Sequence, residues 1–371
     1  MIPKDPISTL MELIQIPSPT NQMGIAIWRD PFDISIQALS GKIEDISGTE
    51  IEKTSGFIMM PFPEKQKGYR ILPQKKYKLP LQNNPLGKPI NPHTNLDNIL
   101  KPCPKTQDST QKTYLNMSEI ALQLIQEENL KKVVLAQKQK IPFPHAGLNI
   151  IPKWIRLVQK HKHAFVYLFL SHHICWMGAS PELLLSLSGQ RIQTHAIAGT
   201  HLLKKDKLPH WNDKEKREQD LVSKHLKKEL KTFVSQLEIQ GPESYPAGEV
   251  VHIRSTLKGQ LKTPHELNLN KLIHALHPSP AICGLPRSTA RDFIHQYEDF
   301  EREFYTGLVG WIRKEKQELS LYVNIRCAQI FSQTVHIYSG AGIVEGSQPL
   351  AEWKETQEKT KTLKSIFYPH T

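Results

Sequence analysis

Residues 321–330 read Leu-Tyr-Val-Asn-Ile-Arg-Cys-Ala-Gln-Ile, and side chains that favour a core alternate with polar ones over most of the stretch. This period of two predicts a β-strand and places Arg326 on the face opposite the core. A second strand is expected at residues 335–338. The small residues 340–342 follow it, and Pro349 then opens a helix that runs to residue 367. The strand–strand–helix order of this stretch is the starting point for the fold.

Outward from this stretch, alternating or continuous apolar runs predict further strands at residues 132–136, 164–170 and 183–187. Helical spacing predicts helices at 118–125, with Ser118 as the N-cap, and at 213–237. Residues 61–104 are rich in Pro, Lys and Asn and are expected to form loops.

Strands thus come in adjacent runs with helices between the runs. This order favours an α+β fold with antiparallel sheets and helices packed outside. No linker is evident after residue 110, so a single domain is expected over residues 1–371. Its N-terminal part would be residues 1–110, and its core motifs lie within residues 115–367.

Composition narrows the class of protein. The four cysteines are far apart and form no C-x-x-C pair, which argues against a zinc site or a disulfide framework. The chain has no apolar run of membrane-spanning length, and its first residues lack the order of a secretory signal, so a cytoplasmic protein is expected.

The net charge of +12 leaves nucleic-acid binding as one hypothesis, which predicts steeply salt-dependent binding. The lysines are spread along the chain, however, and no nucleic-acid motif is present. This pattern favours an ordinary basic surface that can also attract a small anion.

Three glutamates on the two long predicted helices point to a cation site. Glu218 precedes the apolar residues of its helix by three and four positions, so it shares their face. Glu352, Glu355 and Lys359 share one face of the C-terminal helix. A solvated face with ion pairs is the alternative. Carboxylates from two helices that meet at one pocket would suit Mg²⁺, which takes oxygen ligands.

Several short motifs together resemble the chorismate-binding enzymes. This family includes isochorismate synthase, salicylate synthase, the large component of anthranilate synthase, and aminodeoxychorismate synthase. The matching segments, in order, are residues 132–136, 178–184, 196–200, Glu218 in its helix, 277–281, 284–286, 304–307, 325–326 and 340–359. The resemblance implies two stacked antiparallel sheets with helices outside and an active site in the cleft between them.

The resemblance also implies roles for individual residues. Lys132 would be the base that activates water, and Glu182 the acid that protonates the leaving hydroxyl, which requires a raised pKa. Glu218, Glu352 and Glu355 would hold Mg²⁺. The positions that would contact the substrate, chorismate, are Ala198, Gly199, Thr200, His277, Tyr305, Arg326, Gly340, Ala341, Gly342 and Lys359.

Two positions distinguish the branches of the family. Aminodeoxychorismate synthases have a nucleophilic lysine where this chain has Ala198, and amine-adding enzymes lack the lysine seen here as Lys132. The pair therefore resembles the water-adding branch, and isochorismate synthase is the favoured activity, with no glutaminase subunit expected. The alternatives are salicylate synthase, an amine-adding synthase component, and a homologue that has lost its activity.

Some positions depart from the family pattern or are left without a role. Gln137 stands where the family often has arginine, Ser279 where it has threonine, and Gln219 where it has histidine. His161, His163, His172 and His173 are interpreted as structural or surface residues. Isochorismate serves menaquinone or siderophore synthesis, and the sequence favours neither.

Overall fold

The structure is a computed structural model that describes residues 9–10, 12–13, 22–63, 66–81, 100–104, 108–142, 150–171, 174–203, 208–247 and 250–368. The strands are β1 Met23–Arg29, β2 Ser35–Ile46, β3 Gly56–Met60, β4 Gly68–Ile71, β5 Lys75–Pro80, β6 Lys132–Pro142, β7 Phe165–Ser171, β8 Ile174–Ser180, β9 Leu183–Ser188, β10 Arg191–Leu202, β11 Val234–Ala247, β12 Val250–Leu261, β13 Gly284–Leu285, β14 Leu308–Arg313, β15 Glu318–Val323, β16 Cys327–Ile330 and β17 Thr334–Ile343. The helices are α2 Gln111–Gln126, α3 Ile150–Lys160, α4 Asp213–Leu230, α5 Leu269–Leu276, α6 Arg287–Tyr297 and α7 Pro349–Phe367, with short 3₁₀ turns η1 Gly48–Glu50, η2 Pro264–Glu266 and η3 Lys314–Lys316.

The strands form two antiparallel sheets that share β2. The first has the order β5-β2-β1-β7-β8-β16-β17-β6-β13. The second has the order β11-β12-β10-β9-β15-β14-β3-β4-β2. The predicted α+β class with stacked antiparallel sheets is therefore confirmed. Two strands of the N-terminal part pair directly with strands of the core: β1 with β7 and β3 with β14.

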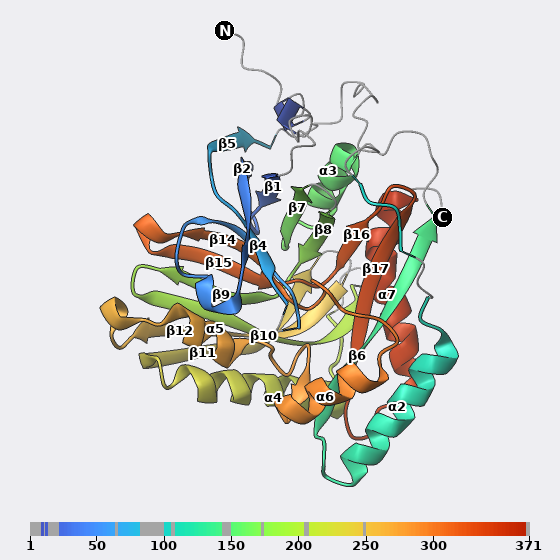
Figure 1. Cartoon of the computed structure of the whole chain (residues 1–371). Helices are drawn as coiled ribbons and strands as arrows, with labels where there is room; N and C mark the ends of the chain where they lie inside the picture. Colours follow the sequence, from blue (N-terminus) through green and yellow to red (C-terminus); the bar gives the residue numbers. More distant parts are fainter. Residues whose placement is uncertain are drawn as a thin grey trace.

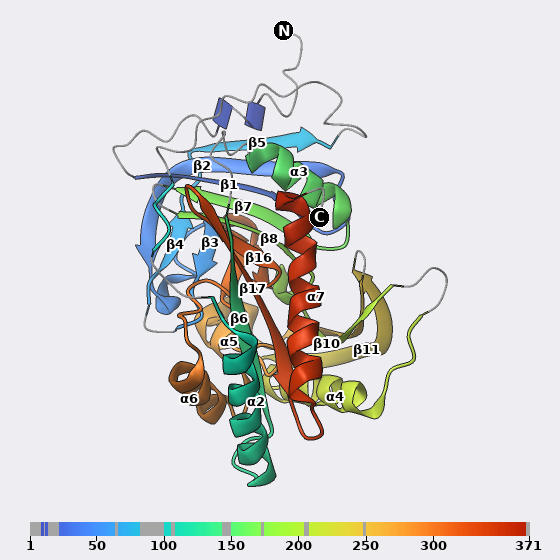
Figure 2. The ribbon, with the colours of Figure 1, turned by 90° about the vertical axis from the view of Figure 1, so that its right-hand side faces the viewer.

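Helices cover the outer faces of both sheets (Figures 1 and 2). Helices α2 and α7 run along β6 and β17, and α3 packs on β7 and β8. Helix α4 lies across β10 and β12 and contacts α5. An aromatic core that includes Phe57, Phe165, Trp176 and Tyr322 fills the space between the sheets. Within the described residues, no helix combines the length and the apolar character that crossing a membrane requires.

The stretch 321–330 is not one strand, as its alternation predicts, but two strands in different sheets. Strand β15 ends at Val323, and β16 begins at Cys327 in the other sheet. Between them, Asn324 is fully buried and donates its Nδ2 to the Phe304 carbonyl, 2.8 Å away. Arg326 adopts φ +50°, a left-handed conformation that interrupts the strand. The alternating pattern does not reveal this break, because apolar residues still occur at every second position on each side of it.

Two other boundaries differ from the prediction. The helix predicted for 213–237 ends at Leu230, and residues 234–247 form β11, whose partner strand β12 overrides their helical spacing. The glycine-containing segment 340–342 belongs to β17 rather than to a loop. Within the stretch predicted to be loops, β4 and β5 are strands, whereas helix α7 spans the predicted residues 349–367.

The prediction that Ser118 is an N-cap is wrong. Helix α2 begins at Gln111, and Thr110 caps it by accepting a hydrogen bond from the Thr113 amide at 3.1 Å. Ser118 is buried inside the helix, where its hydroxyl donates to the Tyr114 carbonyl at 2.8 Å. A serine that bonds to the preceding turn satisfies its own hydroxyl and caps nothing.

Removal of the Thr110 side chain, the actual cap, is therefore expected to lower the free energy of unfolding more than removal of the Ser118 hydroxyl. Thr110→Ala is expected to lower the free energy of unfolding by about 1 kcal/mol because it leaves a helix N–H unsatisfied. Ser118→Ala should change it by no more than about 0.5 kcal/mol, since alanine's helix propensity compensates for the lost hydrogen bond. Urea unfolding of both variants measures the difference, and the reverse order would show that the helix starts at Ser118.

Candidate active site

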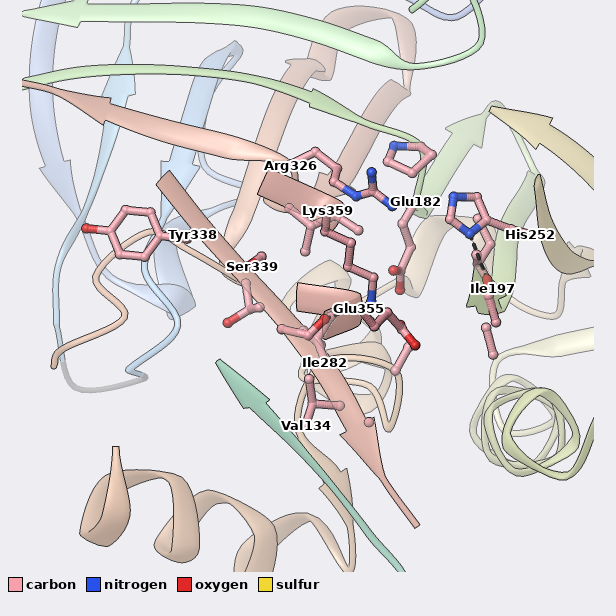
Figure 3. A pocket seen from close by; sticks show the side chains of 18 of the residues that line it. Val134, Glu182, Ile197, His252, Ile282, Arg326, Tyr338, Ser339, Glu355 and Lys359 are labelled. Carbon is pink, nitrogen blue, oxygen red and sulfur yellow. Dashed lines mark hydrogen bonds and ion pairs between the residues drawn. The ribbon is translucent and has the colours of Figure 1, made fainter. Parts of the chain in front are cut away.

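A cavity opens between the two sheets, where strands cross from one sheet to the other. Figure 3 shows the side chains of Arg326, Glu182 and Lys359 converging on it. Its other walls are the start of β6, the end of β17, α4, α7 and the loop around Ile282. The residues predicted to act on the substrate can therefore be compared with the walls of this one cavity.

Glu182 lies at the first crossing, between β8 in one sheet and β9 in the other. Its carbonyl accepts a hydrogen bond from the Val323 amide at 3.0 Å, so the crossing β8–β9 is tied to the neighbouring crossing β15–β16. The Glu182 side chain is 5% exposed. Burial raises its pKa to about 7, against the opposing charges of Lys132 and Lys359. The expected raised pKa of this acid is thus supported by its surroundings.

Arg326 lies at the second crossing, and its carbonyl accepts from the Ala179 amide at 3.0 Å. Burial lowers the pKa of its guanidinium, and Glu355 opposes this shift. His252 on β12 stands across the cavity, with Nδ1 donating to the Gly199 carbonyl at 2.8 Å. Burial, together with the charge of Arg326, lowers the pKa of His252 to about 3, so its ring is neutral. Arg326 can donate hydrogen bonds to an anionic substrate, whereas Nε2 of the neutral His252 ring is left as an acceptor because Nδ1 carries the only N–H.

Lys132 is the first residue of β6 and is fully buried, whereas its neighbour Lys131 is exposed, as the alternation predicts. Lys132 Nζ donates to Glu218 Oε1 at 2.8 Å. Gly342 on the paired strand β17 makes room for this contact, because a Cβ there would lie 2.5 Å from Glu218 Oε1 and 3.1 Å from Lys132 Cε. The glycine thus permits the predicted base and a predicted metal ligand to meet.

Lys359 on α7 reaches back toward the same strand. Its Nζ donates to the Gly340 carbonyl and to Glu355 Oε1, both at 2.7 Å. Burial raises the pKa of Glu355, but Lys359, Lys214 and Arg326 outweigh burial and lower it overall. Tyr305 closes this side of the cavity, with its hydroxyl 2.9 Å from the position that a Cβ on Gly340 would take.

Lys214 on α4 is a functional candidate that sequence reasoning missed. It forms an ion pair with the buried Glu352. Burial alone would lower the pKa of Lys214, yet the charges of Glu352, Glu218 and Glu355 raise it overall. An ammonium group therefore lies among the three carboxylates predicted to bind magnesium. The sequence feature that could have identified Lys214 is its position one helical turn before Glu218.

The donor chemistry of these glutamates fits magnesium. Their oxygens are hard ligands, and Mg²⁺ sites often use one or two carboxylates completed by substrate and water. Glu218 and Glu355 line the cavity, whereas Glu352 is not among its lining residues and is buried in an ion pair with Lys214. Among the described residues no three His, Cys, Asp or Glu side chains form a ready-made ligand cluster. Each of the three glutamates has a lysine partner instead.

The structure brings most of the predicted residues together. Those that line the cavity are Glu182, Ala198, Gly199, Glu218, Tyr305, Arg326, Gly340, Gly342, Glu355 and Lys359. Ala341 alternates away from it and is 1% exposed. His277 lies in the wall of a different cavity. The side chain of Thr200 is outside the described residues.

The three departures from the family pattern are satisfied locally. Gln137 Nε2 donates to Ser339 Oγ at 3.0 Å, and Gln357 donates to Gln137. Gln219 donates to Ser255 at 2.7 Å. Ser279 Oγ accepts from the Ala281 amide at 3.2 Å. Each replacement thus has a hydrogen-bonding partner near the cavity.

The four cysteines are free thiols, as predicted. His161 is nearly buried and His163 packs against Phe32, whereas His172 and His173 lie outside the described residues. No metal cluster forms around the described histidines.

Fold and site together define a class of protein: a two-sheet α+β protein with a buried acid, an arginine and a lysine around one small cavity. Comparison with known proteins agrees. Residues 81–368 match the family model described as chorismate binding enzyme. Isochorismate synthase DhbC of Bacillus subtilis is 31% identical over 71% of this chain and 68% of its own length. Isochorismate synthase MenF of Escherichia coli is 31% identical over 68% of this chain and 60% of its own.

Solved structures share the fold. A 2,3-dihydroxybenzoate-specific isochorismate synthase of Bacillus anthracis superposes with a TM-score of 0.77 at 21% identity, covering 96% of this chain and 99% of its own. Anthranilate synthase component I of Streptococcus pneumoniae gives a TM-score of 0.66 at 20% identity, covering 98% of this chain and 86% of its own. The chain belongs to the chorismate-binding enzyme family.

The close approach at Gly342 gives a direct test of the site. Gly342→Ala should separate Lys132 from Glu218 and reduce chorismate turnover by about 100-fold or more, because displacement by an ångström is enough to cost that much. Gly48→Ala is the matched control, since a Cβ at Gly48 meets nothing within 4 Å. Equal activity in both variants, measured at equal thermal stability, would remove the Lys132–Glu218 contact from the site.

Proposed function

We propose that this protein is an isochorismate synthase, which converts chorismate to isochorismate by adding water at C2 and releasing the C4 hydroxyl. The observation that carries the proposal is the pair Lys132 and Glu182. Glu182 is a buried carboxyl that lines the cavity and whose pKa is raised to about 7. Lys132, at the start of β6, is fully buried behind the cavity wall and contacts Glu218, which lines it, through Nζ at 2.8 Å. One group can accept a proton while the other donates one.

The reaction needs both proton transfers. As the proposed base, Lys132 Nζ takes a proton from the attacking water, and its hydrogen bond to Glu218 holds it in position. Glu182, protonated below about pH 7, gives its proton to the departing C4 hydroxyl. The net result is one proton gained at Lys132 and one lost at Glu182, and proton exchange with solvent returns both groups to their starting states before the next turnover.

The remaining groups bind and orient an anion. Chorismate carries two carboxylates, and Arg326 can hold one through two parallel hydrogen bonds. Lys359 adds positive charge to the same cavity. A magnesium ion held by Glu218, Glu352 and Glu355 would supply charge neutralisation at the ring carboxylate of the substrate.

The amine-adding alternatives lack support at the site. Ala198 lines the cavity where aminodeoxychorismate synthases have a nucleophilic lysine, and so it offers no amine to the substrate. A glutaminase partner is accordingly not part of the proposal. The relatives DhbC of Bacillus subtilis and MenF and EntC of Escherichia coli, which are similar to this chain in sequence, carry names of isochorismate synthases.

Replacement of the proposed base tests the function. Lys132→Ala is expected to lower isochorismate formation by about 10²- to 10⁴-fold, the usual contribution of a general base. Lys131→Ala, one residue away on the exposed side, should leave the rate within a factor of about two, as expected for a surface change. Chromatography of chorismate reactions gives both rates, and a fully active Lys132→Ala enzyme would refute the assignment.

Protonation of Glu182 sets the expected pH dependence. Because the pKa of Glu182 is about 7 and its protonated form is the donor, kcat/KM for chorismate should fall above pH 7. With isochorismate as substrate Glu182 acts as the base, so kcat/KM should instead fall below pH 7. A profile that is flat between pH 6 and about 8.5 in both directions would contradict this role.

Magnesium dependence can be tested on one helix. EDTA should abolish turnover and Mg²⁺ should restore it. Glu355→Gln is expected to raise the Mg²⁺ concentration needed for half-maximal rate by about tenfold or more. Glu358→Gln removes an exposed carboxylate of the same helix, which pairs only with the surface residue Lys361, and should not move the titration. Identical titrations for the two variants would exclude Glu355 as a ligand.

A further inference from the structure

Lys214 differs from the other two lysines that pair with the predicted magnesium ligands. Lys132 is fully buried, and Lys359 has a second bond, to the Gly340 carbonyl at 2.7 Å. Lys214 pairs with Glu352, donates to no other acceptor among the described residues, and keeps 27% of its side chain exposed. It is therefore the least firmly held of the three ammonium groups and the one with the most open access to water.

The Lys214 ammonium lies in the field of all three carboxylates. Although burial lowers its pKa, the charges of Glu352, Glu218 and Glu355 raise it overall. Its ion pair with Glu352 joins the first turn of α4 to the first turn of α7, which lie near each other in Figure 2. Because a buried carboxylate without a counter-charge is costly, Lys214 stabilises Glu352 in the protein without metal.

Mg²⁺ and the Lys214 ammonium would compete for the same carboxylates. Three lysines already balance the three glutamates, so a divalent cation that entered with all three in place would leave an excess of positive charge beside Arg326. Like charges repel strongly at short range where water is scarce. The described carboxylates also form no ready-made ligand cluster, so metal binding requires side chains to move. A long, partly exposed lysine is the side chain best able to do so.

We propose that Lys214 is an internal counter-ion, which neutralises the carboxylates when the metal is absent and swings into solvent when Mg²⁺ binds. This inference rests on the magnesium-dependent function proposed above. The exchange lowers the affinity for the metal, because part of the binding free energy of Mg²⁺ is used to break the Lys214–Glu352 pair. The alternative is a permanent ion pair that ties α4 to α7 with or without metal.

The test removes the ammonium group and measures metal binding without substrate. Full-length wild-type protein and Lys214→Met are titrated with Mg²⁺ alone in a calorimeter at about pH 8, where carboxylates are ionised. Because methionine cannot compete for Glu352, Mg²⁺ should bind the variant about tenfold more tightly. Lys216→Met removes an exposed lysine of the same helix and is the matched control. It should change the affinity by less than about twofold.

Thermal unfolding distinguishes a displaced counter-ion from a permanent ion pair. In EDTA, Lys214→Met should unfold about 3 °C or more below the wild type, because Glu352 is left buried without a counter-charge. In about 20 mM Mg²⁺ the difference should close to about 1 °C or less, since the metal replaces the ammonium. A permanent pair predicts the same difference in both conditions. Lys214→Gln, which removes the charge and keeps a donor, replaces the methionine variant if that variant does not fold in either condition.

Three outcomes would overturn the proposal. They are a Mg²⁺ affinity of the folded variant that is not raised, a loss of stability that Mg²⁺ does not reverse, or no binding of Mg²⁺ to either protein. Isochorismate formation by the wild type is measured separately. If isochorismate forms alongside one of these outcomes, the proposed function stands and only the role of Lys214 falls. If Lys214→Met binds Mg²⁺ more tightly but the wild type forms no isochorismate, the counter-ion stands and the proposed function falls.

Discussion

Two strand crossings, side by side and tied by backbone hydrogen bonds, are the feature on which the rest of the site depends. At each crossing the chain leaves one sheet and enters the other, and the residue at that point faces the space between them. Glu182 and Arg326 occupy these points. Two hydrogen bonds, each 3.0 Å long, tie the crossings together: one from the Val323 amide to the Glu182 carbonyl and one from the Ala179 amide to the Arg326 carbonyl. An acid and an anion-binding arginine are thus held by main chain, which leaves their side chains free for substrate.

A second constraint holds the opposite wall. Glu298 and Arg302, each 2% exposed at the side chain, form an ion pair on the segment after α6. Arg302 donates to the carbonyls of Val134 and Ile282, and Glu298 accepts from the Ala136 amide. These bonds connect β6, which carries Lys132, to the loop that lines the cavity. Because removal of one partner would leave a buried charge, the pair holds the wall rigidly.

Residue types and their order were enough to predict the fold class, helix α7, and the position of Glu218 on the apolar face of its helix, whereas the role of Lys132 was predicted from the family resemblance. Periodicity could not predict the break at Asn324, since the buried amide that ends the strand finds its partners in Phe304 and Tyr167, far away in sequence. The pairing of Lys214 with Glu352 and the position of His277 in another cavity are likewise tertiary facts. Short-range patterns gave the composition of the site, and contacts between distant segments determined which residues reached it.

The proposed reaction uses water as the nucleophile, and an isotope experiment tests this step most directly. Chorismate and Mg²⁺ are incubated with the protein in ¹⁸O-enriched water, and the product is analysed by mass spectrometry. The account predicts isochorismate with one ¹⁸O atom at C2. Isochorismate without the label, formation of salicylate and pyruvate as final products, or no conversion of chorismate would contradict it.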